Sequence, residues 1–126
     1  MTFHHIGVAC SNIETTLQKI RNLHPNILEI SEILHDPLQE VDLCMVSLQD
    51  GLQLELVSGK PIQKFLDSKN SFYHICYEVE DITKSIAHFT ANSSVLISPP
   101  KPAILFNNRH VCFLLTPYGI VELLEK

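Results

Sequence analysis

The stretch FHHIGVA at residues 3–9 has a counterpart in FYHICYE at residues 72–78, which begins 69 residues further along the chain. Apolar side chains alternate with other residues in both stretches, and this period of two predicts β-strands. Each strand carries a histidine at its third position, His5 in the first and His74 in the second. Alternation places both histidines on the face opposite the following isoleucine. The shared pattern predicts an internal repeat.

The repeat continues beyond these two strands. Ser11 begins an S-x-x-E capping box in front of apolar residues at helical spacing, which predicts a helix over roughly residues 12–22. Asp81 is the matching N-cap of a helix in the second half. The ends of the halves also agree, with LELV at residues 54–57 and VELL at residues 121–124. Each half is therefore predicted to form one strand, then one helix, then three further strands.

Turn signals support this order. Asp50-Gly51 predicts a hairpin in the first half, and Pro117-Tyr118-Gly119 predicts one in the second.

The other segments carry weaker patterns. We expect a strand within residues 27–34 and a short strand at 95–97. Residues 98–102 hold three prolines and predict a stiff, extended loop. Pro61 begins a short helix near residues 62–69, because proline is accepted in the first helical turn.

A single half would leave an apolar sheet face and a helix stripe poorly covered. We therefore predict an α+β fold in which two tandem βαβββ modules form a cup-shaped mixed β-sheet with the helices on its outer face. The expected organisation is one domain over residues 1–126. Module 1 takes about residues 1–60, a linker helix about 61–70, and module 2 about 71–126.

Composition excludes several classes of function. The chain has 126 residues and a formal net charge of -5, which argues against a nucleic-acid binder. Its Lys and Arg residues are scattered, and no apolar run approaches the ~20 residues that cross a bilayer. No membrane association is expected. The first residues show no secretory signal, and the predicted location is the cytoplasm.

The cysteines are Cys10, Cys44, Cys76 and Cys112. More than thirty residues separate each from the next, so no zinc-finger spacing is present. Without an export signal a disulfide framework is not expected. The sequence predicts four buried, reduced thiols.

Four polar residues share the predicted face away from the helices: His5, Glu55, His74 and Glu122. Two imidazoles and two carboxylates suit a divalent first-row metal ion. Taken singly, each could instead be a structural histidine or a solvated glutamate on an open sheet face. Their equivalent positions in the two halves, and the small or uncharged neighbours Gly7, Ala9 and Cys76, favour a metal site.

The motifs HHIGVA at 4–9, LELV at 54–57, YHICYEV at 73–79 and IVELLE at 120–125 resemble the vicinal oxygen chelate superfamily, which includes glyoxalases, bleomycin resistance proteins and dioxygenases. Within it, the likeness is nearest to the methylmalonyl-CoA epimerase group, with glyoxalase I next. It covers about residues 3–125.

The resemblance implies that His5, Glu55, His74 and Glu122 are metal ligands. The ion would be cobalt, nickel, manganese, magnesium or zinc. It also implies a homodimer.

The chemistry implied by the resemblance is that of an epimerase or isomerase acting through an enolate. The substrate would be a small molecule, an acyl thioester such as an acyl-CoA or a 2-oxoacid-like compound. Glu122 is the first candidate for the catalytic base and Glu55 the second. Asp42 or Glu78 could supply a further acid/base group, and the sequence leaves this choice open.

The sequence departs from the epimerase group at Glu55, where epimerases often carry Gln, and at AILFNN over residues 103–108, which replaces a glycine-rich segment. This loop leaves open whether CoA is accommodated. Arg109 could contact CoA phosphates or be a solvated surface charge.

Two other functions are alternatives to the epimerase. One is a glyoxalase I-type lyase acting on a thiol adduct, and the other is a metal-free module that binds a small molecule such as an antibiotic. A ring-cleaving dioxygenase is disfavoured by the fourth protein ligand.

Overall fold

The computed structural model describes residues 1–126. The chain forms two compact units. One unit comprises His5–Tyr73, and the other comprises Met1–His4 together with His74–Lys126. The unit of His5–Tyr73 is called the first unit, and the other is called the second unit. No helix is both long enough and apolar enough to span a membrane.

The first unit holds most of β1 (Thr2–Ala9), followed by α1 (Ile13–Leu23), β2 (Ile27–Ile30), β3 (Leu34–Asp36), β4 (Val41–Leu48) and β5 (Gln53–Ser58). The strand order is β2-β4-β5-β1, and β3 also pairs with β4. β1 and β5 are parallel, whereas the other pairs are antiparallel. A 3-10 helix η1 (Lys60–Ile62) and α2 (Gln63–Asp67) follow β5, as the Pro61 signal predicted.

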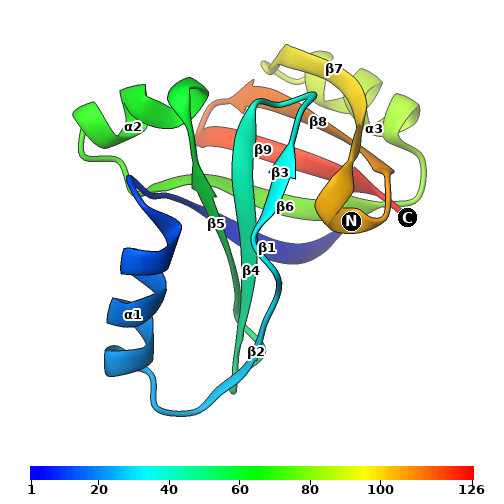
Figure 1. The fold of residues 1–126 in the computed structure, drawn as a ribbon. Coiled ribbons are helices and arrows are strands. Elements are labelled where there is room, and N and C mark those ends of the chain that lie inside the picture. Colours follow the sequence, from blue (N-terminus) through cyan, green and yellow to red (C-terminus); the bar gives the residue numbers. More distant parts are fainter. The chain divides into compact units, whose positions relative to one another are not determined.

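The core of the first unit lies between α1 and its sheet (Figure 1). Ile13 and Leu17 of α1 pack with Cys44 and Val46 of β4 and Leu56 of β5. These core residues occupy only one face of the sheet, because alternate side chains of each strand point to the opposite face. His5 and Glu55 lie on that second face.

The second unit repeats the arrangement with β6 (Phe72–Val79), α3 (Ile82–Thr90), β7 (Val95–Ala103), a 3-10 helix η2 (Ile104–Phe106), β8 (Arg109–Thr116) and β9 (Gly119–Glu125). Its strand order is β6-β9-β8-β7, and β6 and β9 are parallel. Ile82 of α3 packs on Cys112, Leu114, Val121 and Leu123. The predicted α+β fold is confirmed, and the second unit has the predicted βαβββ order. The first unit has one strand more, because β2 and β3 stand where a single strand was expected.

Three local predictions need correction or refinement. The N-cap of α1 is Asn12, not Ser11, because the Asn12 side chain accepts the hydrogen bond from Thr15 N. The predicted strand at 27–34 is two strands, β2 and β3. Residues 98–102 are extended as expected but belong to strand β7, which accepts prolines because it pairs only with β8 in its unit and shifts register twice.

All four cysteines are free and buried, which confirms the prediction from their spacing. Burial raises the pKa of the Cys10 and Cys44 thiols, and it raises that of Cys112 to about 12. These thiols are therefore protonated and unreactive at neutral pH.

Candidate metal centre

The first unit contains a buried histidine–glutamate pair. His5 comes from β1 and Glu55 from its parallel neighbour β5, where the Cα partner of Glu55 is Gly7. His5 precedes Gly7 by two residues and so shares its face. The distance from His5 Nε2 to Glu55 Oε1 is 3.6 Å, and both side chains are buried.

The second unit contains an equivalent pair. His74 comes from β6 and Glu122 from its parallel neighbour β9, where the Cα partner of Glu122 is Cys76. His74 precedes Cys76 by two residues, as His5 precedes Gly7. His74 Nε2 lies 3.5 Å from Glu122 Oε1, and both side chains are buried. The sequence repeat is thus a repeat of strand register and of side-chain chemistry.

The neighbours of the two glutamates are also equivalent. Met45 of β4 is the cross-strand partner of Glu55, and Phe113 of β8 is the partner of Glu122. The Phe113 ring stands edge-on to the His74 imidazole, with ring centroids 5.4 Å apart. An apolar neighbour beside each carboxylate excludes water and strengthens its interaction with a nearby cation.

The geometry of each pair fits two ligands of one cation. A distance of 3.5–3.6 Å is long for a hydrogen bond between nitrogen and oxygen. Two ligand atoms that each lie about 2.1 to 2.2 Å from one ion are roughly 3.0 to 3.6 Å apart, depending on the angle between them. A histidine–glutamate ion pair would also be compatible with these distances. Each pair offers one imidazole nitrogen and one carboxylate, donor types that divalent first-row metals accept.

The structure separates the two further acid/base candidates. Asp42 stands three residues from Met45 on β4 and therefore points to the face opposite Glu55. There it contacts His35, whose Nδ1 lies 2.9 Å from Asp42 Oδ1. Asp42 is thereby removed from the face that carries the pair in its unit.

Glu78 does share the face of His74, but it lies four positions further along β6, which corresponds to roughly 13 Å. Its carboxylate accepts a hydrogen bond from Arg109 Nη2. This contact with the guanidinium lowers the pKa of Glu78 below its ordinary value. A carboxylate held in this way is a poorer proton acceptor, which disfavours Glu78 as a catalytic base.

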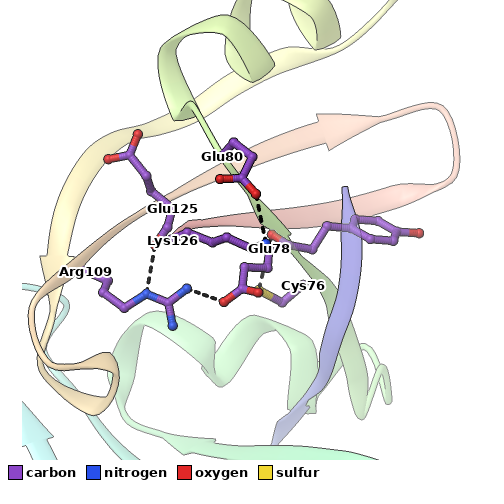
Figure 2. Close-up of polar contacts among 7 residues, drawn as sticks. Cys76, Glu78, Glu80, Arg109, Glu125 and Lys126 are labelled. Atoms are coloured by element: carbon purple, nitrogen blue, oxygen red, sulfur yellow. Dashed lines mark hydrogen bonds and ion pairs between the residues drawn. The ribbon is translucent and has the colours of Figure 1, made fainter.

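Sequence reasoning missed the role of Arg109. Its Nη2 donates to Glu78, and its Nε donates to the backbone oxygen of Glu125 at 2.8 Å, so Arg109 at the start of β8 links the ends of β6 and β9 (Figure 2). Lys126 contacts Glu80 alongside at 2.9 Å. Glu78 and Glu125 lie more than fifteen residues from Arg109 in the sequence, and no local signal connects them with it.

A family model for the glyoxalase/bleomycin resistance protein/dioxygenase superfamily matches residues 4–113. The chain belongs to this superfamily. The resemblance to the vicinal oxygen chelate proteins is therefore confirmed. No curated protein matches the chain at the level of sequence.

Several solved structures share the fold over nearly the whole chain. A hypothetical protein of Bacillus halodurans C-125 is 24% identical with a TM-score of 0.78, over 99% of this chain and 94% of that chain. Methylmalonyl-CoA epimerase of Mycobacterium tuberculosis is 15% identical with a TM-score of 0.81, over 98% and 87%. A variant of the Streptomyces coelicolor epimerase in complex with 2-nitronate-propionyl-CoA is 19% identical with a TM-score of 0.80, over 100% and 97%.

Proposed function

We propose that this protein is a metal-dependent epimerase or isomerase that acts through an enolate on an acyl-CoA or 2-oxoacid-like substrate. In this proposal His5, Glu55, His74 and Glu122 hold one divalent ion. The observation that carries it is the presence of two buried His–Glu pairs with the same register, one in each unit. Membership of the superfamily and the fold shared with methylmalonyl-CoA epimerases support it.

The donor set narrows the choice of ion. Imidazole nitrogen suits zinc, nickel and copper, whereas magnesium favours an all-oxygen environment. Among the ions expected for the family, cobalt, nickel and zinc therefore suit this set better than manganese and magnesium. When bound, such an ion would draw electron density from two neighbouring substrate oxygens and acidify the adjacent C–H bond.

The residues of the chain would supply the proton transfers. Glu122 is the first candidate for the base that removes the carbon-bound proton, and Glu55 is the candidate for the group that returns one. Both glutamates have the apolar cross-strand neighbours Phe113 and Met45, which would keep competing water away. His5 and His74 would orient the carboxylates beside them.

The experiment that tests this proposal has two readouts. Metal content is measured by elemental analysis after loading with each ion and dialysis, and proton exchange at carbon 2 of methylmalonyl-CoA is followed in D₂O by NMR. We expect about one ion per chain and time-dependent loss of the C2 proton signal. Glu122→Gln should lower both, whereas the matched control Glu78→Gln should lower neither. A parent protein that takes up no divalent ion would contradict the proposal and favour a metal-free binding module.

A glyoxalase I-type lyase is the second candidate, and Glu55 favours it. The family resemblance implies that epimerases often carry Gln at this position, whereas glyoxalase I carries Glu. Methylglyoxal with glutathione provides the direct test. Formation of the thioester product by the metal-loaded protein, without exchange on methylmalonyl-CoA, would replace the epimerase by the lyase.

We also extend the proposal to assembly and expect a homodimer, as the family resemblance implies. Sedimentation velocity over a range of concentrations measures the assembly state directly.

A further inference from the structure

The sheet of the second unit carries an exposed apolar row beside its His–Glu pair. Phe113 and Glu122 are cross-strand partners, and the next partners on the same face are Leu115 of β8 and Ile120 of β9. Val95 of β7 pairs with Leu115 from the other side. Val95 is 63% exposed and Leu115 is 51% exposed. Val95, Leu115 and Ile120 are here called the apolar row.

This row is not part of the hydrophobic core. The core of the second unit is built on the opposite sheet face, where Leu114 and Val121 pack with Ile82 of α3. Exposed apolar side chains that continue directly from a buried polar pair are typical of a ligand-binding wall.

The equivalent row of the first unit is polar. Ser47 of β4 pairs with Gln53 of β5, two residues from the partners Met45 and Glu55, and Glu29 of β2 pairs with Ser47. The two rows thus occupy the same register in their units. One offers a carboxylate, a hydroxyl and an amide, whereas the other offers three aliphatic side chains. This difference shows that the repeat alone does not require an apolar row.

The cations of the second unit's sheet lie at its other end. Lys101 pairs with Val111, four residues before Leu115. Arg109 precedes Leu115 by six residues, which corresponds to roughly 20 Å of strand. Arg109 is also held by Glu78 and Glu125. A charged substrate group would therefore find no complementary cation among the residues of the apolar row.

From this contrast we propose that the apolar row binds an uncharged alkyl or aryl group of the substrate, carried next to the oxygens that the metal would chelate. This inference rests on the proposed function and deepens it, since it names the substrate class. The compound would be one with a hydrophobic substituent beside two neighbouring oxygens, and Val95, Leu115 and Ile120 would determine the specificity for that substituent.

Alkyl hydroxamates provide the probe, because their two neighbouring oxygens chelate metal ions and their chain length is variable. Dissociation constants of acetohydroxamate and hexanohydroxamate are measured by calorimetry on the metal-loaded protein. Each methylene that becomes buried strengthens binding about fourfold. Part of the hexanohydroxamate chain would stay in water, which reduces the gain. We therefore expect it to bind at least about tenfold more tightly than acetohydroxamate.

Leu115→Ser and Val95→Ser should each remove most of this chain-length gain while leaving the affinity for acetohydroxamate unchanged. Ser47→Ala is the matched control at the equivalent position of the first unit, and it should keep the full gain. Circular dichroism confirms that each variant is folded.

The outcomes separate this inference from the proposed function. Equal affinity for both hydroxamates on a protein that does bind metal would show that the apolar row does not bind the substituent. The proposed metal site would be unaffected by that result. A protein that takes up no divalent ion would overturn both. If Leu115→Ser converts a dimer to a monomer in sedimentation velocity and leaves the chain-length gain intact, the row is a contact between copies of this chain and the inference is wrong.

Discussion

The Phe113 ring stands edge-on to the imidazole of His74, with ring planes at 83° and centroids 5.4 Å apart. Because Phe113 is also the cross-strand partner of Glu122, one aromatic side chain contacts or adjoins both members of the second pair. Edge-to-face aromatic pairs contribute about 0.5–1.5 kcal/mol beyond the area they bury.

Phe113→Leu is therefore expected to lower the free energy of unfolding by about 1 kcal/mol or more, since the edge-on contact is lost. It should also weaken metal binding, because the His74 ring would be less well oriented. Urea unfolding and metal titration measure the two effects. Met45→Leu, at the equivalent position of the first unit, is the control for a change of apolar shape without a ring contact. Unchanged metal affinity in Phe113→Leu would show that the ring does not orient His74.

Removal of a donor from either pair should affect metal binding similarly, because the pairs are equivalent. His5→Ala and His74→Ala are each expected to weaken metal affinity at least about tenfold, the lower end of what even indirect metal partners contribute. His35→Ala, which alters an exposed histidine, is the control. A large loss in one variant and none in the other would contradict a shared site.

The Glu78–Arg109 contact predicts a pH-dependent contribution to stability. Because the pKa of Glu78 is lowered in the folded protein, the contact stabilises the fold above the unfolded pKa of about 4.3 and is lost as pH falls through the folded pKa. Glu78→Gln should cost about 1 kcal/mol or less at pH 7, since both side chains are partly exposed. The difference from the parent should shrink below pH 4.

Urea unfolding of parent and variant at several pH values measures this contribution. Glu80→Gln is the control, because Glu80 contacts Lys126 from an exposed position and its removal should change stability less. A difference between parent and Glu78→Gln that grows toward acidic pH would contradict the assigned sign.

The backbone conformation of Gly59 makes its substitution costly to stability. Its φ is +140°, and a Cβ at this position would lie 2.9 Å from the carbonyl oxygen of Glu40. Gly59→Ala should therefore cost roughly 1–3 kcal/mol in the free energy of unfolding. Gly51→Ala is the matched control, since Gly51 also has positive φ but a Cβ there meets nothing within 4 Å. Equal losses in the two variants would show that the close approach to Glu40 is relieved at no cost.

The buried thiols predict slow chemical labelling. Since burial raises the pKa of Cys112 to about 12, almost none of it is thiolate at pH 8. A thiol-reactive chromophore should label the folded protein slowly and all four cysteines rapidly in urea. Fast labelling of a cysteine without denaturant would reveal local opening around it.

The sequence by itself determined the repeat, the order of elements apart from the division of residues 27–36 into two strands, and the strand face on which His5 and His74 lie. These features follow from periodicity along the chain, which is a local property. The donor types of the proposed metal site could also be predicted, because alternation places His5 and Glu55 on predictable faces of their own strands. The cap at Asn12 was missed by one position, because Ser11 and Asn12 are both good N-cap residues and only the backbone geometry selects one.

Only the tertiary structure decided which side chains meet. The register that brings Glu55 beside His5 and Glu122 beside His74 depends on parallel pairing between strands far apart in sequence. The same is true of the Arg109–Glu78 contact, of the opposite orientation of Asp42, and of the apolar row. Strand register is set by packing across the whole sheet, and a shift of one residue would turn every side chain to the other face.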